Sequence, residues 1–310
     1  MILHNLFLSV GLSLYFPCMV SKQEIKTDIY LFSAAMLWGL GFVAQRQGME
    51  YLGPFSYSAL RFSLGTLVVL IFYVFQKKNT RIHAKLKDVL KSGLIIGILL
   101  FAAVNTQQIG LKTTEAGKAG FITSLYMVFV PVFGIFLGRR VRLSVLTGIA
   151  LALSGLYFMS VRGAFVIETG DLLIFICSIL WAIHFLFIAH YTKKVDAVLL
   201  SICQFAVCSL LSILAALFTE SINMESFVSS IPAVLYGGIG SVGIAYTLHV
   251  VALKTSEPAY ASLILSMESV FGALGGRIIL GEAMSQRELF GAALILSGVA
   301  FAQIRQRKRK

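Results

Sequence analysis

The sequence predicts an all-α polytopic membrane protein in which ten transmembrane helices form two inverted five-helix repeats. Three observations predict this fold class: the hydropathy of the chain, an internal duplication and the distribution of basic residues. Of the 310 residues, 58% are hydrophobic and 13% are charged, whereas about 25% of the residues of a soluble domain are charged. The mean hydropathy is +0.87. Apolar runs of about 20 residues, the length that crosses the hydrocarbon core of a bilayer, recur along the whole chain.

A tandem duplication relates the two halves of the chain. The segment Gly-Ile-Ala-Leu-Ala-Leu-Ser-Gly at 148–155 recurs as Gly-Ala-Ala-Leu-Ile-Leu-Ser-Gly at 291–298, with six of the eight positions identical and a separation of 143 residues. The segments at 37–39 and 180–182 share Leu-Trp at the same separation. Each half is therefore one repeat unit. We expect an N-terminal extension and cytoplasmic lead at 1–27, repeats at 28–162 and 163–304, and a basic cytoplasmic tail at 305–310.

The individual helices follow from the apolar runs and their flanking residues. Residues 2–18 are apolar but match nothing in the second half, so they form an extra helix, an interfacial segment or an upstream extension before a natural start at Met19; we favour the extension. Pro54 and Pro258 stand at helix starts, where a missing N–H is not needed, and Ser256 and Glu257 supply a polar cap. The predicted spans are 29–46, 55–76, 89–110, 115–137, 143–161, 170–191, 197–218, 230–251, 258–280 and 287–304.

The basic residues predict the orientation of these spans. If residue 28 is cytoplasmic, the inner segments contain nineteen Lys and Arg residues and the outer segments five. By the positive-inside rule both termini are then cytoplasmic, in a bacterial-type cell (inner) membrane. An odd number of spans in each repeat inserts the second repeat upside-down relative to the first. Such inverted repeats are typical of secondary transporters, whose substrate site lies near the midplane between the halves.

Polar side chains inside the bilayer indicate a site, because each needs a partner or water. Glu268 is a carboxylate in the middle of an apolar run, and we expect it to carry a coupling proton or bind a cationic group; a structural carboxyl bonded to a neighbouring helix is the alternative. Under the repeat, Tyr126 matches Glu268 and Gln107 matches His249. The residues expected to line a central cavity are Trp38, Asn105, Gln108, Tyr126, Trp181, His184, Tyr246 and His249.

Structural roles remain open for several of these residues. The two histidines are explained equally well as satisfied core residues, and the two tryptophans as packing at the repeat interface. A metal site is disfavoured because no H-x-x-x-H spacing occurs. Arg61 lies well inside the second span and matches uncharged Gln204 in the other repeat, so we expect it to brace neighbouring helices rather than bind substrate.

Several short segments in this order resemble the EamA family of the drug/metabolite transporter superfamily. They are Leu-Trp-Gly at 37–39, Ala-Leu-Arg-Phe at 59–62, the run from Gly117 to Leu125 with Val-Pro at 130–131, the run at 261–271 that contains Glu268, Leu-Gly-Glu at 280–282, and the run at 291–298. The resemblance covers residues 28–304. It implies ten helices in two inverted repeats, alternating-access transport of small metabolites, often amino-acid export, and a cavity lined by helices 1, 3, 4, 6, 8 and 9. The first repeat has Gly138-Arg139-Arg140 where the second has Gly281-Glu282, so a symmetric role for that glutamate is not expected.

We therefore predict a secondary active transporter, an exporter of small polar metabolites such as amino acids. A channel or helix-bundle scaffold is the first alternative. An intramembrane enzyme is disfavoured, because neither a G-x-S-x-G nor an H-E-x-x-H motif is present, and no phosphate-binding loop indicates ATP hydrolysis. The predicted partners are a small-molecule substrate, the lipid bilayer and a proton, but no nucleic acid, cofactor or metal. The chain is expected to act as a monomer or homodimer.

Overall fold

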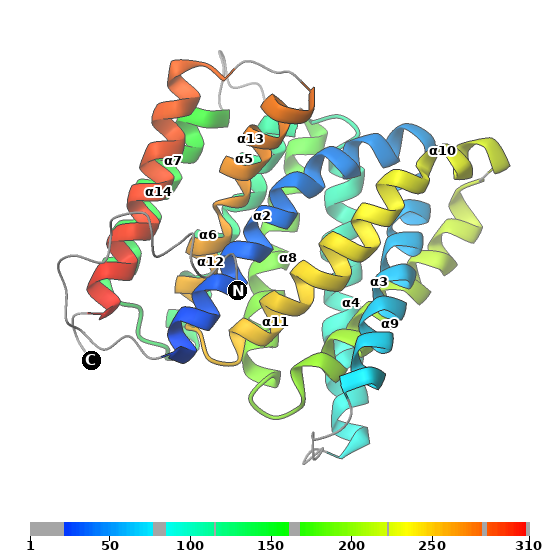
Figure 1. Cartoon of the computed structure of the whole chain (residues 1–310), viewed down its shortest axis with the longest axis horizontal. Coiled ribbons are helices and arrows are strands. Elements are labelled where there is room, and N and C mark those ends of the chain that lie inside the picture. The colour runs from blue at the N-terminus through cyan, green and yellow to red at the C-terminus, as the bar shows by residue number, and fades with distance from the viewer. Residues whose placement is uncertain are drawn as a thin grey trace.

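The computed structural model describes residues 22–76, 85–114, 116–160, 168–221, 223–280 and 284–307. All regular structure in these ranges is helical (Figure 1). The predictions for residues 1–18 and for Gly281-Glu282 lie outside the described residues. The helices are α2 (Lys22–Tyr51), α3 (Pro54–Gln76), α4 (Leu86–Gly110), α5 (Ala116–Ser124), α6 (Tyr126–Phe136), α7 (Leu143–Ser160), α8 (Thr169–Tyr191), α9 (Ala197–Thr219), α10 (Met224–Leu235), the π-helical segment η1 (Tyr236–Tyr246), α11 (Thr247–Leu253), α12 (Pro258–Leu265), α13 (Glu268–Leu280) and α14 (Gln286–Arg307).

Eight helical segments of the described chain are long and apolar enough to cross a membrane. Two of them are composite: Ala119–Phe136 runs through α5 and α6, and Met224–Leu253 runs through α10, η1 and α11. The pair α12 and α13, and the helix α14, complete ten rods. The prediction of an all-α polytopic membrane protein is confirmed. The predicted ends are less accurate, since the span expected at 29–46 is part of a 30-residue helix, Lys22–Tyr51.

Large apolar side chains cover the outside of the bundle. In a soluble protein, contiguous apolar patches of this kind are rare, but they suit contact with lipid tails. The most exposed among them have relative accessibilities of 80% or more: Phe75, Phe136, Phe218 and Ile278.

The packing of the helices follows the internal repeat. Helix α3 packs against α9, and α7 packs against α14, as Figure 1 also shows for the second pair. These are pairs of repeat counterparts, so each helix contacts its own equivalent. Helix α4 packs against α8 and α9, and correspondingly η1 packs against α2 and α3. Each of these helix contacts of the first repeat therefore has an equivalent contact in the second repeat.

The α7–α14 contact is built from the duplicated glycine motif. A Cβ added at Gly148 would lie 2.6 Å from the carbonyl oxygen of Gly298, and one added at Gly291 would lie 2.5 Å from that of Gly155. Because the two helices are antiparallel, each end of one motif meets the opposite end of the other. The glycines let the two backbones approach closely, as small residues do at helix interfaces in membranes.

The fourth and ninth rods are interrupted at equivalent places. The amide of Leu125 bonds the carbonyl of Ile122 at 3.2 Å, and the amide of Met267 bonds that of Ile264 at 3.1 Å, both three residues back. Each rod therefore tightens for one turn into 3₁₀-type bonding before a new α-helix begins. The interruption precedes Pro131, which lies within regular α6. Tyr126 and Glu268 are the first residues of the resumed helices.

Candidate functional site

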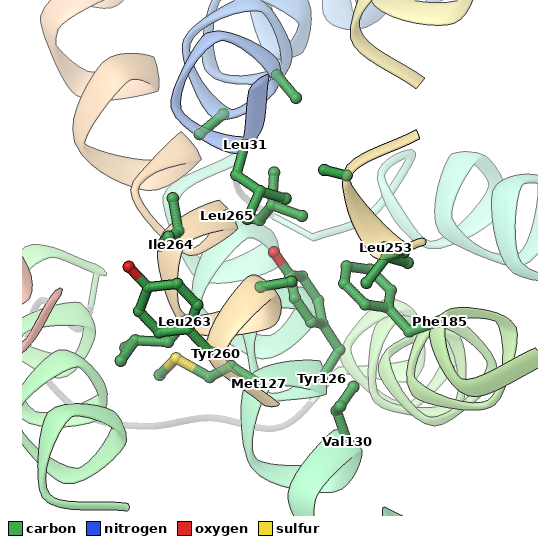
Figure 2. Close-up of a cluster of buried hydrophobic side chains, with 14 of the residues drawn as sticks. Leu31, Tyr126, Met127, Val130, Phe185, Leu253, Tyr260, Leu263, Ile264 and Leu265 are labelled. Atoms are coloured by element: carbon green, nitrogen blue, oxygen red, sulfur yellow. The ribbon is translucent and has the colours of Figure 1, made fainter. Parts of the chain in front are cut away.

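Tyr126 and Glu268 meet at the centre of the molecule. The Tyr126 hydroxyl donates a hydrogen bond to Glu268 Oε1 over 3.3 Å, and the two residues are only 4% and 6% exposed. They occupy matching positions in the two repeats, so the pair lies where the halves face each other. Tyr126 also stacks on Phe185, with ring centroids 5.3 Å apart, in the buried cluster drawn in Figure 2.

This pair lines a small internal cavity with a volume of about 60 Å³. That volume holds a few water molecules and is well below the 300–1,000 Å³ typical of drug-sized ligand sites. In this conformation the cavity is therefore too small for a metabolite. The lining residues are Trp38, Phe42, Gln45, Arg61, Val104, Gln107, Thr123, Tyr126, Trp181, Phe185, Ser241, Tyr246, His249 and Glu268.

Much of the cavity wall is a set of repeat counterparts. Trp38 and Trp181 occupy matching positions, as do Phe42 and Phe185. The matching also holds for Gln107 with His249 and for Val104 with Tyr246. The two halves thus contribute similar, mainly aromatic surfaces to a shared space.

Hydrogen bonds fix both indole rings. Trp181 Nε1 donates to Gln107 Oε1 at 2.9 Å, and Trp38 Nε1 donates to the backbone carbonyl of Ser241 at 3.1 Å. Trp38 also contacts the ring of His249 edge-on, with centroids 5.3 Å apart. The tryptophan of each half is therefore held by the third helix of the other half. Buried indoles commonly find such a partner for their N–H group.

His249 has no hydrogen-bond partner in the part of the chain that the structure describes. Its side chain is 0% exposed, it lies on the cavity wall, and neither ring nitrogen is bonded. The rings of Phe185 and Tyr246 pack against it, with centroids 4.4 Å and 6.0 Å away. Because an unbonded buried polar group is costly, these nitrogens are available to water or to a bound molecule in the cavity.

Arg61 is the one Lys or Arg side chain among the described residues that line the cavity. It is 5% exposed, and its guanidinium carbon lies 5.3 Å and 5.1 Å from the ring centroids of Tyr57 and Phe62. Its Nε has no hydrogen-bond acceptor. The cavity wall therefore carries one cation and one carboxyl group, Glu268, on different helices.

Six of the nine site residues predicted from the sequence line the cavity. The other three, Asn105, Gln108 and His184, are turned toward neighbouring helices. Asn105 Nδ2 donates to the carbonyl of Phe101 and to Ser212 Oγ, Gln108 Nε2 donates to Met49 Sδ, and His184 Nε2 lies 3.1 Å from Gln204 Oε1. Their polarity thus serves contacts between helices in this conformation.

The cavity contains residues that the sequence did not single out as site residues. Gln107 rather than Gln108 reaches the cavity, and its match with His249 in the repeat was the signal that could have selected it. Phe42 and Phe185 match each other in the repeat, but like Ser241 they carried no polarity signal, because apolar residues and serines are common in membrane helices. Among the described residues, no group of three or more His, Cys, Asp or Glu side chains could hold a metal ion.

Comparisons with known proteins agree with this architecture. The sequence profile of the EamA-like transporter family matches residues 25–161 and again residues 168–303. An uncharacterized transporter of Archaeoglobus fulgidus is 29% identical over 91% of this chain and 87% of its own length. The uncharacterized inner membrane transporter YedA of Escherichia coli is 24% identical over 88% of this chain and 89% of its own length. A protein of known crystal structure superimposes with a TM-score of 0.76 at 22% identity, over 92% of this chain and 98% of that one. The two matches of the family profile take in most of the chain, which therefore belongs to the EamA-like transporter family.

Proposed function

We propose that this membrane transporter is a secondary active exporter of small polar metabolites, with Glu268 as the proton carrier. The observation that carries this proposal is the Tyr126–Glu268 pair, which joins matching positions of the two halves inside the central cavity. A carboxyl group inside the membrane has an unfavourable free energy, so a carboxyl group at this place indicates a function. Its partner is a tyrosine rather than a basic residue, which leaves its proton exchangeable without breaking an ion pair.

Alternating access follows from the packing of the two halves. At the end of the bundle where α2 begins, Asp28 accepts hydrogen bonds from Tyr260 at 3.1 Å and from Gln303 at 2.8 Å. At the opposite end, Glu220 accepts bonds from Ser56 of α3. Both sets join the first repeat to the second. We propose that breaking either set in turn opens the cavity to one side of the membrane.

The orientation is proposed from charge. Arg139, in the connection between α6 and α7, interacts electrostatically with His190 near the end of α8 and with Glu257 before α12. These connections therefore lie at one end of the bundle, and they carry a cluster of basic residues, including Arg140, Arg142, Lys193 and Lys194. We propose that this end faces the cytoplasm of a bacterial-type cell, with both termini.

Flux in proteoliposomes tests the proposal. Amino acids, monocarboxylates, polyamines and nucleosides are first screened by thermal shift, because a molecule that binds only the folded protein raises its apparent stability. A hit is then measured for saturable counterflow and for accumulation driven by a pH gradient. We expect Glu268→Gln to keep counterflow and lose pH-driven accumulation.

Tyr126→Phe is the matched control, since it removes the hydrogen bond and keeps the carboxyl group. It should retain pH-driven accumulation, with altered affinity. Accumulation that is unchanged in Glu268→Gln would exclude the proton role. Flux that rises linearly with concentration and never saturates would instead identify a channel.

A further inference from the structure

The two halves of the cavity wall share aromatic positions but differ in charge. The aromatic residues Trp38 and Phe42 have aromatic counterparts, Trp181 and Phe185. Arg61 does not, because the matching residue in the second repeat is Gln204. A transporter built on two equivalent halves has no need of a single cation in its cavity for the sake of the fold. The asymmetry therefore points to the molecule that the cavity binds.

The contacts of Gln204 show what a bracing residue does at this position. Gln204 is 0% exposed, and its Oε1 lies 3.1 Å from Nε2 of His184, which joins α9 to α8. Among the described residues Arg61 has no comparable bond: its Nε has no acceptor, and its guanidinium lies over the faces of two aromatic rings. The expectation that Arg61 braces neighbouring helices is therefore not supported by its contacts.

A buried cation without an anionic partner is unfavourable unless something neutralises it. Ring faces attract a cation only weakly, by less than the cost of desolvating an unpaired charge. Glu268, the carboxyl group on the same wall, bonds to Tyr126, and no ion pair joins it to Arg61 within the described part of the chain. The missing partner of Arg61 is then an anion that enters and leaves with the cavity's occupant.

We propose that Arg61 binds a carboxylate group of the transported molecule, and that an apolar or aromatic part of the same molecule packs between Trp38 and Trp181. The planar guanidinium presents its donors in a fork that matches a carboxylate, and such bonds are about twice as strong as neutral ones. This inference rests on the proposed transport function and narrows its substrates to small carboxylates with a hydrophobic group.

The two tryptophans make the proposal directly measurable. The chain contains two tryptophans, Trp38 and Trp181, and both lie on the cavity wall. Their fluorescence therefore reports on the occupancy of the cavity, with no transport needed. The probes are 3-phenylpropanoate and its uncharged amide, 3-phenylpropanamide, titrated into the purified full-length protein in nanodiscs. They share the ring and chain, and differ in the charge that Arg61 would recognise.

We expect the carboxylate to change the fluorescence saturably, with an affinity at least about ten-fold higher than that of the amide. Arg61→Gln introduces the residue that the second repeat has at this position, and should reduce the preference for the carboxylate over the amide to about two-fold or less. Arg61→Lys keeps the charge without the fork, so it should retain an intermediate preference and serve where Arg61→Gln folds poorly. The proposal would be overturned if the unchanged protein bound both probes with equal affinity or gave no response to the carboxylate. It would also be overturned if the folded Arg61 variants kept the full preference for the carboxylate.

One further probe separates this result from the transport proposal. 2-Phenylethylamine carries the ring and a cation, and tighter binding of this amine than of the carboxylate would contradict the assignment of Arg61. Saturable, pH-driven flux of another molecule would leave the transport function intact in that case. If instead no molecule showed saturable flux while the carboxylate still bound at Arg61, the transport proposal would be contradicted and the assignment of the binding site would stand.

Discussion

Neighbouring glutamines on α4 have different environments. Gln107 accepts the indole N–H of Trp181 at 2.9 Å, whereas the amide group of Gln108 donates to Met49 Sδ and its Oε1 has no partner. We predict that Gln107→Leu lowers the free energy of unfolding by about 0.6 to 1.7 kcal/mol, the range measured for side-chain hydrogen bonds between membrane helices. Thermal unfolding and the emission maximum of the freed indole are the measurements.

The adjacent Gln108→Leu is the control for that substitution. It removes an unbonded buried oxygen together with one weak bond to sulfur, and such a replacement is near neutral or stabilising. Its melting temperature should equal or exceed that of the unchanged protein, with unaltered fluorescence. If Gln108→Leu destabilised the protein more than Gln107→Leu, the assignment of Gln107 as the residue that holds Trp181 would be wrong.

The sequence predicted which residues were unusual better than it predicted where their side chains point. Glu268, Tyr126 and both tryptophans stand out because the bilayer penalises polar groups and the repeat pairs their positions. Asn105 and His184 share that polarity but bond to neighbouring helices, and hydropathy cannot separate the two uses. Only the rotation of each helix about its axis distinguishes Gln107 from Gln108, and that rotation is fixed by packing between segments far apart in the chain.

At the scale of single elements, the α7–α14 contact depends on the absence of side chains. A Cβ at Gly155 would overlap the carbonyl oxygen of Gly291, and one at Gly148 would lie 2.6 Å from that of Gly298. We predict that Gly148→Val lowers the free energy of unfolding by about 1 to 3 kcal/mol, the usual cost of overpacking. Thermal unfolding followed by size-exclusion chromatography is the measurement.

Gly120→Ala is the matched control, because a Cβ at Gly120 of α5 meets open space. It should keep or raise the stability, since alanine is favoured over glycine within a helix. Equal melting temperatures for Gly148→Val and Gly120→Ala would show that α7 and α14 are farther apart than described. The duplicated motif is visible in the sequence, but the contact between its two copies became clear only in the structure.

The N-terminus of α3 is capped by a residue of the other repeat. Glu220, just after α9, accepts the amides of Phe55 and Ser56 at 3.0 Å and 2.8 Å. We predict that Glu220→Ala destabilises this helix end by about 0.5 to 2 kcal/mol, as loss of a cap does. Hydrogen exchange of the peptide covering residues 54–60 should accelerate.

Glu225→Ala provides the comparison, because Glu225 is exposed in the first turn of α10. It should leave exchange in residues 54–60 unchanged. Unaltered exchange in Glu220→Ala would mean that the bond across the repeats contributes nothing to holding this end closed. This cap joins segments that are more than 160 residues apart in the chain, and no local pattern in the sequence predicted it.

At the scale of the whole molecule, the duplication was the most informative feature of the sequence. It predicted a membrane bundle of two related halves, and the pairing of α3 with α9 and of α7 with α14 follows the same relation. The lengths of the helices were less predictable, because hydropathy detects the part of a helix that lies in lipid. Helix α2 extends beyond that part, from Lys22 to Tyr51.

The orientation of the bundle in the membrane is a prediction that labelling can decide. Lys194, in the turn between α8 and α9, and Ser285, before α14, are exposed, and the proposed orientation places them on opposite sides of the membrane. In a background with the four natural cysteines replaced, Ser285→Cys should react with an impermeant maleimide in intact cells. Lys194→Cys should react only after permeabilisation. The reverse pattern would show that the bundle has the opposite orientation in the membrane, and the end assigned to the cytoplasm would then face outward. Reaction of both in intact cells would place both connections outside, an arrangement that the helices between them do not allow if each crosses the membrane once.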